Sequence, residues 1–504
     1  MLAVMVVPFV LASGTVPPAS PAAGADELLR PGVRLAVAGD SITEQALYSR
    51  FIELYLLACK PEIEARVMQF GWSGESAPGF AARMANDLLL FKPHVVTLCY
   101  GMNDGLYQVY QPSIGETYEQ ALVGIVRRLK AAGAQPVVGS PGAVDTYTFK
   151  QNGLTPAVYN DNLAHLRDIA RRLAQAEGCR FADLHAAMMR AMTQAKQRLG
   201  EGYEVCGQDG FHPAANGHLV MAYAFLKALG LDGDIGTITA VFEARSLRSA
   251  SATEGHSVVS VAANRITLES KRYPYCFSGE GTSPSGTRSI VPFVPFNEEL
   301  NRFVLKVQGL ETARAVVTWR REAEGRREVE GRREAEGRRE VEGRREVEGR
   351  REVEGRREVE GRREVEGRRE VEGRGEVEGR TLAEGLGGSG GRAHGGASRG
   401  FSRQELEAGI NLAAEFLDSP FADAFERVEQ LVLEKQQYEI AMIKQAISPV
   451  REQRRILGDD AEAEKAWAIL YGRFLAKGDA LQEKARAAVV AVRHWIEILP
   501  DPGS

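Results

Sequence analysis

The sequence has few cysteines and almost no excess charge, and each shortage excludes a class of protein. Its five cysteines, Cys59, Cys99, Cys179, Cys206 and Cys276, are too few and too scattered for a disulfide framework, and no Cys-x-x-Cys spacing indicates a zinc site. The 63 basic and 68 acidic side chains give a formal net charge of -5, which offers nothing to a nucleic acid partner. We therefore expect no nucleic acid partner, no metal and no other cofactor.

Long apolar runs are also lacking. The only one, Leu2 to Leu11, is too short to span a bilayer, and Ala23-Gly24-Ala25 follows it as an A-x-A cleavage site. Residues 1–25 are therefore predicted to be a signal peptide of a secreted or periplasmic protein without stable membrane insertion. No basic residue precedes the apolar run, so an N-terminal anchor stays open as the alternative.

The first two hundred residues have the pattern of an α/β domain. Short β-branched runs alternate there with longer amphipathic segments, which is typical of strand-helix-strand units and a parallel sheet. The expected strands are Val33 to Ala38, Ala65 to Phe70, His94 to Tyr100, Pro136 to Ser140 and Arg180 to Asp183. The expected helices are Thr43 to Ala58, Tyr118 to Ala132, Val158 to Glu177 and His218 to Ala228. We predict a three-layer α/β/α domain over residues 28–232.

The pattern changes after this domain to alternating strands. Residues 233–320 are predicted to be the first part of a β-rich accessory domain, with a hairpin across Gly309 that joins the strands 301–308 and 314–319. Residues 401–499 are predicted to be helical, except for a final strand over 489–499 that can pair back with the hairpin. The helices would then be an insertion in the β domain.

Residues 321–400 separate the two halves of this accessory region. They begin with ten hexads of the form R-E-V-E-G-R and continue as a Gly-rich tract. A six-residue period advances about 600° around an α-helix, so the apolar residues never form one stripe and cannot build a core. We expect a solvated, fluctuating helix continued by a flexible Gly-rich tract, and favour a tandem expansion over a functional spacer.

Four short clusters at the ends of predicted elements carry the residues that chemistry would need. They are Gly39-Asp40-Ser41-Ile42, Phe70-Gly71-Trp72-Ser73-Gly74-Glu75, Gly101-Met102-Asn103-Asp104 and Asp209-Gly210-Phe211-His212-Pro213. A serine becomes a competent nucleophile when an imidazole takes its proton and a carboxylate fixes the imidazole tautomer. The fourth cluster holds both of these groups, so it can serve a serine at the carboxyl edge of the sheet.

In this order and at these spacings the four clusters resemble the SGNH or GDSL hydrolases, and the resemblance covers about residues 33 to 230. More loosely, the whole sequence resembles bacterial exported members of this family that have a C-terminal accessory region. The resemblance implies an SGNH-like fold in which Ser41 is the nucleophile, His212 the general base and Asp209 its orienting carboxylate. The N–H groups of Ser41 and Gly74 and the side-chain amide of Asn103 would form the oxyanion hole. Many members have Asn where this sequence has Gln69, so the resemblance leaves the hydrogen bonds around that turn open.

The expected activity is that of a serine esterase that hydrolyses acyl esters, with acetyl esters on carbohydrates favoured as the small-molecule or glycan substrate. Two alternatives stay open, namely a lipid or thioester acylhydrolase and a non-catalytic glycan-binding or scaffold protein. The sequence leaves the oligomeric state undefined. Asp40 and Asp104 are expected to bond to their local loops, and His218 is expected to be structural.

Overall fold

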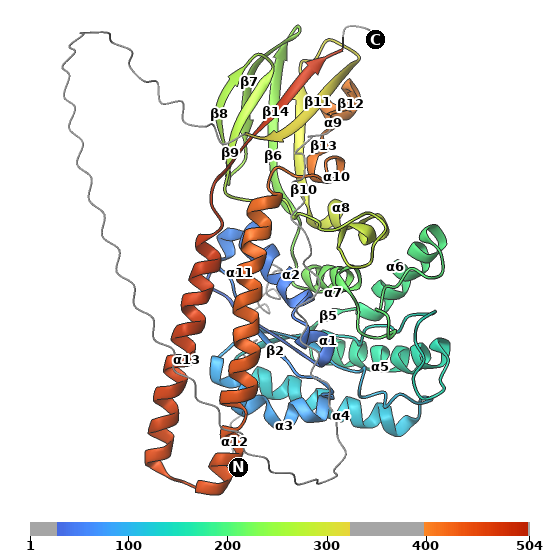
Figure 1. Ribbon diagram of the computed structural model, residues 1–504, viewed down its shortest axis with the longest axis vertical. Helices are drawn as coiled ribbons and strands as arrows, with labels where there is room; N and C mark the ends of the chain where they lie inside the picture. The colour runs from blue at the N-terminus through green and yellow to red at the C-terminus, as the bar shows by residue number, and fades with distance from the viewer. Residues whose placement is uncertain (1–27, 323–397, 502–504) are drawn as a thin grey trace, which may run out of the picture. The chain divides into compact units, whose positions relative to one another are not determined.

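The structure is a computed structural model that describes residues 28–322 and 398–501 (Figure 1). The predicted signal peptide lies outside the described residues, as does the hexad repeat from residue 323 onward. Within the described ranges, no helix combines the length and the apolar character needed to cross a membrane. All five cysteines are described, and each is a free thiol.

The first domain is built on a parallel five-stranded sheet with the order β2-β1-β3-β4-β5. The strands are β1 (Arg34–Gly39), β2 (Arg66–Gly71), β3 (Val95–Cys99), β4 (Gln135–Gly139) and β5 (Arg180–Ala182). All five agree with the predicted strands to within one residue at each end. Gly39 of β1 is in register with Gly71 of β2 and Cys99 of β3, so these three strands end side by side.

Helices cover both faces of this sheet (Figure 1). One layer holds α3 (Ala77–Asp87), α4 (Pro112–Ala131) and α5 (Pro156–Ala176), and the other holds α2 (Tyr48–Leu54), α6 (Leu184–Leu199) and α7 (Ala215–Ala228). Alternate residues of β1 face alternate layers, because Leu35 packs with the second layer and Ala36 with the first. The three-layer α/β/α prediction is therefore confirmed, although the sequence reading missed α3 and α6.

The helix expected over 43–58 is interrupted. The structure has α1 (Ser41–Glu44), then Ala46 in the left-handed region at φ 52°, then α2, which continues as a π-helical turn over Tyr55–Cys59. The break separates the short helix that carries Ser41 from the longer helix that packs on the sheet.

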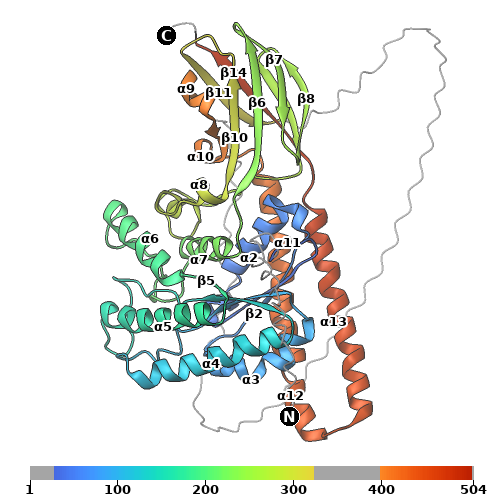
Figure 2. The same cartoon turned by 180° about the vertical axis from the view of Figure 1, so that it is seen from behind.

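The accessory domain is a sandwich of two sheets (Figure 2). One sheet has the order β13-β10-β6-β7, from Ile410–Asn411, Arg302–Gln308, Asp234–Glu243 and Ser246–Ala252. The other has the order β12-β11-β14-β9-β8, from Ser398–Ser402, Arg314–Arg321, Val492–Pro500, Arg265–Ser270 and His256–Ala262. Phe303 of β10 and Trp319 of β11 are fully buried, with ring centroids 5.6 Å apart.

The predicted hairpin across Gly309 is wrong. β10 runs parallel to β6, whereas β11 pairs with β12 and β14 in the other sheet. Each strand has one apolar face, and opposite sheets allow these two faces to bury one another, which a hairpin within one sheet would not. The predicted return of the last strand is confirmed, because β14 lies antiparallel to β11.

The segment between β12 and β14 is largely helical, as predicted. It holds α9 (Arg403–Ala408), α10 (Leu412–Glu415), α11 (Ala422–Ala441), a π-helical turn (Met442–Ile447), α12 (Val450–Leu457) and α13 (Ala461–Ala487). α9 begins with a capping box of Ser402 and Glu405 and ends before Gly409, whose φ is 106°. We refer to residues 422–487 as the arm.

The arm packs on the α/β domain, along the edge strand β2. Lys435 of α11 donates to the carbonyl of Val67, and Glu439 accepts from the backbone N–H of Gln69 at 3.1 Å. Lys435 also bonds to Glu53 at 2.9 Å. These side chains are almost completely buried. Because an edge strand presents unpaired backbone groups, these two bonds give partners to Val67 and Gln69 of β2, and the arm covers this edge of the sheet.

Candidate active site

Ser41 lies where the tight connection from β1 enters α1. The preceding Asp40 caps this helix, because its carboxylate accepts from the N–H of Ile42 at 3.0 Å. A side chain at Gly39 would lie 2.1 Å from the hydroxyl of Thr43, so the turn requires glycine there. The serine is thus held at the carboxyl edge of the sheet, as the sequence predicted.

Ser41, His212 and Asp209 form one chain of hydrogen bonds. The distance from Ser41 Oγ to His212 Nε2 is 2.8 Å, and that from His212 Nδ1 to Asp209 Oδ2 is 2.6 Å. Because a carboxylate can only accept, Nδ1 carries the proton and Nε2 is free to accept from the serine hydroxyl. Burial acts to raise the pKa of Asp209, but hydrogen bonds from His212 and Phe211 outweigh it and hold that pKa below its usual value. The carboxylate is therefore ionised at neutral pH.

The loop that carries His212 depends on glycine and on a buried ion pair. Gly210 has φ 86°, and a side chain there would lie 2.3 Å from the Cα of Phe149. Asp145 accepts from the N–H of Val205 at 3.0 Å and pairs with Lys196 at 3.0 Å. Both charged side chains are buried. These contacts fix the start of the loop relative to β4 and α6.

The second and third clusters follow β2 and β3, the strands on either side of β1. The N–H of Trp72 donates to the carbonyl of Gly39 at 3.0 Å, which ties the second cluster to the first. Gly74 has φ 73°, and no atom beyond its chain neighbours lies within 4 Å of the position that a Cβ would take. Asn103 donates its side-chain amide to the carbonyl of Glu75 at 2.9 Å, so the structure links it to the residue after Gly74. No bond joins Gly74 or Asn103 to Ser41 among the described residues.

The structure defines the hydrogen bonds around Gln69. Its amide donates to the carbonyl of Thr43 in α1, and its Oε1 accepts from the N–H of Gly71 at 2.9 Å. The side chain is completely buried. Gln69 therefore links the helix after the serine to the turn of the second cluster, which the resemblance had left open.

Two buried carboxyl groups flank the clusters. Burial raises the pKa of Asp40 to about 7 and that of Asp104 to about 6. Asp40 bonds to Ile42 in its own loop, as expected, whereas Asp104 accepts from the N–H of Ala77 at 2.9 Å, at the start of α3 and 27 residues away. His218 is likewise structural, since it is buried between Gln45 and the backbone of α2.

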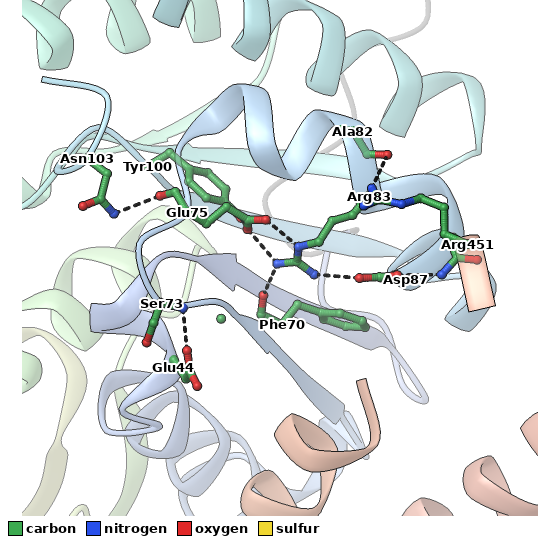
Figure 3. A network of polar contacts seen from close by, with 12 residues as sticks. Glu44, Phe70, Ser73, Glu75, Ala82, Arg83, Asp87, Tyr100, Asn103 and Arg451 are labelled. Carbon is green, nitrogen blue, oxygen red and sulfur yellow. Dashed lines mark hydrogen bonds and ion pairs between the residues drawn. The ribbon is translucent and has the colours of Figure 1, made fainter. Parts of the chain in front are cut away.

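A polar network behind the second cluster was missed by the sequence reading (Figure 3). Arg83 of α3 forms two hydrogen bonds to the carboxylate of Glu75, and Tyr100 donates to the same carboxylate. An arginine inside an amphipathic helix gives no sequence signal of a buried contact. The nearest signal is Glu75 itself, which stands beside Gly74 in the cluster.

Aromatic side chains surround the histidine side of the site. The ring of Phe211 lies 4.4 Å from that of His212, and Tyr107 lies 5.5 Å from Phe211. Leu106 and Tyr107 both have a left-handed backbone, and Leu106 is 60% exposed. Leu106 therefore presents apolar surface to solvent. In the described part of the chain, no group of three or more His, Cys, Asp or Glu side chains could hold a metal ion.

Comparisons with known proteins agree with this site. Residues 37–220, which contain all five predicted site residues, match the model of the GDSL-like lipase/acylhydrolase family. An acetylxylan esterase from Geobacillus stearothermophilus is 25% identical over 222 residues, which are 40% of this chain and 95% of the relative. The solved structure of a gut microbial diltiazem-metabolizing enzyme matches with a TM-score of 0.61 at 19% identity, over 95% of this chain and 100% of that one. This match shows that the two proteins have a similar fold.

Proposed function

Because residues 37–220 match the model of the GDSL-like lipase/acylhydrolase family, we propose that the protein is a serine ester hydrolase and that Ser41 is its nucleophile. The observation that carries this role is the hydrogen-bonded chain from Ser41 through His212 to Asp209. Ser41 Oγ attacks the ester carbonyl while its proton passes to His212 Nε2. The same proton then leaves with the alcohol, and an acyl-enzyme remains.

In the second half of the reaction, water replaces the alcohol. His212 Nε2 takes a proton from the water, the resulting hydroxide attacks the acyl carbonyl, and the proton returns to Ser41 Oγ as the acid departs. Asp209 keeps the imidazole oriented and stabilises its charged form throughout, without taking the proton itself.

The oxyanion of both tetrahedral intermediates requires donors, and three are available at the sheet edge. The N–H of Ser41 stands at the first position of α1, where a helix leaves its N–H groups without a partner in the helix. The N–H of Gly74 and the amide of Asn103 complete the set. Asn103 donates one amide hydrogen to the carbonyl of Glu75, and its second amide hydrogen can bond to the oxyanion.

For the substrate, we propose acetyl esters on carbohydrates. Two observations support this choice. The curated relative at 25% identity is named an acetylxylan esterase. The rings of Tyr107 and Phe211 near His212 offer flat apolar surface against which a sugar ring can lie.

The test is hydrolysis of p-nitrophenyl acetate, p-nitrophenyl octanoate and acetylated xylo-oligosaccharides by the purified protein, with Ser41→Ala as the control. We expect the wild type to prefer acetate and release it from the oligosaccharide, and the variant to be inactive. Preference for octanoate would favour a lipid acylhydrolase. Equal activity of wild type and Ser41→Ala would refute the nucleophile.

We further propose that the protein acts outside the cytoplasm, on the basis of the apolar run and the A-x-A site in residues 1–25. N-terminal sequencing of protein from the native host should begin near Asp26. Recovery of Met1 in the soluble cytoplasm would contradict export.

A further inference from the structure

We propose that Arg83 is a positioning residue that holds the oxyanion donors Gly74 and Asn103 in place through Glu75. The inference rests on the proposed function, because it assigns a support to the oxyanion hole of that same site. Arg83 Nε lies 2.6 Å from Glu75 Oε1, and Nη2 lies 2.7 Å from Oε2 (Figure 3). This is the two-pronged geometry in which arginine fixes a carboxylate in both position and plane.

Glu75 connects this ion pair to both donors. It directly follows Gly74, so anchoring its side chain restrains the Gly74 backbone and, through it, the Ser73–Gly74 peptide that carries the Gly74 N–H. Its own carbonyl accepts from the Asn103 amide at 2.9 Å. Figure 3 shows Asn103 on one side of Glu75 and the Arg83 guanidinium on the other. A shift of the Glu75 backbone would therefore displace both donors together.

The surroundings leave the pair little freedom to move. The side chains of Arg83 and Glu75 are 4% and 6% exposed. Tyr100 donates its hydroxyl to Glu75 Oε2 at 2.9 Å, and Arg83 Nη2 also donates to the carbonyl of Phe70 at 2.9 Å. Arg83 thus ties the end of β2 to the residue five positions later, across the turn that contains Gly74.

The position of the pair points to geometry more than to stability. Buried ion pairs are often no more stabilising than apolar residues of the same volume, since both charges lose their hydration. An apolar pair of the same volume would fill the space but would have no hydrogen bonds to fix the orientation of residue 75. Catalysis is sensitive to that orientation, because the donors must meet the oxygen only when its charge develops.

The network supplies its own control residue. Asp87 is completely buried and contacts the same guanidinium at Nη1, 3.2 Å away, but it lies at the far end of α3 and touches neither Gly74 nor Asn103. A purely structural role for Arg83 predicts similar consequences from losing either carboxylate. A positioning role predicts that only the loss of Glu75 affects catalysis.

The experiment compares Arg83→Met, Arg83→Lys, Glu75→Gln and Asp87→Asn on p-nitrophenyl acetate, with active sites counted by titration with diethyl p-nitrophenyl phosphate. We expect Arg83→Met and Glu75→Gln to lower kcat per active site about 10- to 100-fold with KM nearly unchanged, which is less than the loss of an oxyanion donor itself. Arg83→Lys should restore part of this loss, and Asp87→Asn should stay within about threefold of the wild type.

Tyr100→Phe keeps the inference testable if Arg83→Met does not fold, because it removes one hydroxyl and no volume. We expect it to lower kcat by a few fold without a change in KM. Unchanged kcat per active site in Glu75→Gln and Tyr100→Phe would overturn the inference, as would a rise in KM alone or an equal loss in Asp87→Asn. An inactive wild type would instead refute the proposed function.

Discussion

The two loops that face Ser41 are constructed in different ways. The histidine loop is local, because Asp209 and His212 lie three residues apart and bond directly to one another. Its two key side chains are also fairly open, at 43% and 28% exposed. This single loop therefore supplies both the carboxylate and the imidazole, and the rest of the domain only anchors it.

The oxyanion loop, by which we mean residues 70–75, is held by distant parts of the chain. Asn103, which follows a different strand, bonds to its Glu75, and Arg83 of α3 holds it from behind. On its outer side, the N–H of Ser73 donates to Glu44, which pairs with Lys444 of the arm at 2.6 Å. Because this loop depends on several separate elements, substitutions in any of them can displace it, and we expect their effects on kcat to differ in size.

The largest effect is expected on the local side. His212→Ala removes the group that we propose takes the serine proton, so kcat should fall about 10⁴- to 10⁶-fold. Asp209→Asn should cost less, about 10³- to 10⁴-fold, because the imidazole survives in a poorer tautomer. Steady-state hydrolysis of p-nitrophenyl acetate measures both.

Asp183→Asn is the control for the carboxylate. Asp183 is also an aspartate near the sheet edge, but it caps α6 and pairs with Arg171 instead of the histidine. Its variant should keep nearly full activity. An equal loss in Asp183→Asn and Asp209→Asn would show that the wrong carboxylate had been assigned.

The next largest effect lies on the oxyanion side. Asn103→Ala removes a donor that acts on the developing charge, so kcat should fall about 10²- to 10³-fold with little change in KM. The split between kcat and KM is the measurement that matters. A variant that lost only substrate affinity would move Asn103 from the oxyanion hole to a binding role.

The contrast between the loops also explains what the sequence could reveal. Ser41 follows a strand, and Asp209 and His212 share one short cluster, but that the three act together was implied only by the resemblance to the SGNH or GDSL hydrolases. The support from Arg83 could not be foreseen, because its partner Glu75 is reached only when α3 folds back over the end of β2. The sequence reading missed α3 altogether.

The fold shows the same limit. Strands of the α/β domain were predicted closely, since a buried parallel strand is a continuous apolar run. The pairing of strands was harder to predict. β10 and β11 were each predicted as strands, but only the tertiary structure decides that Phe303 and Trp319 face one another from opposite sheets. The arm was predicted as helices, whereas its contact with β2 depends on Lys435 and Glu439.

A third prediction concerns the attachment of the arm. Lys435→Met would leave the carboxylates of Glu53 and Glu439 buried without their cation, so we expect the free energy of unfolding to fall by about 3 to 5 kcal/mol. Urea denaturation followed by circular dichroism measures this. Lys465→Met is the matched control, because its pair with Glu462 is exposed and should change the midpoint little. Equal midpoints in the two variants would show that the arm is only loosely attached.

The smallest effect is expected where the arm reaches the oxyanion loop. Lys444 pairs with Glu44, and its Nζ lies 5.0 Å from the ring centroid of Trp72. Burial acts to raise the pKa of Glu44, but the hydrogen bonds from Lys444 and Ser73 outweigh it and hold that pKa below its usual value. Glu44 therefore stays ionised at neutral pH and keeps both contacts.

Lys444→Met should therefore lower kcat only slightly. The two side chains are 29% and 20% exposed, so their pair contributes about 0.5 to 1 kcal/mol, and full transmission to the transition state would change the rate about two- to fivefold. Lys484→Met removes a pair of the same kind, with Glu434 at 2.8 Å, that lies within the arm and away from the loop. It should leave kcat unchanged. If both variants lose activity equally, the arm acts through its overall packing, and the contact with Glu44 has no separate part in holding the oxyanion loop.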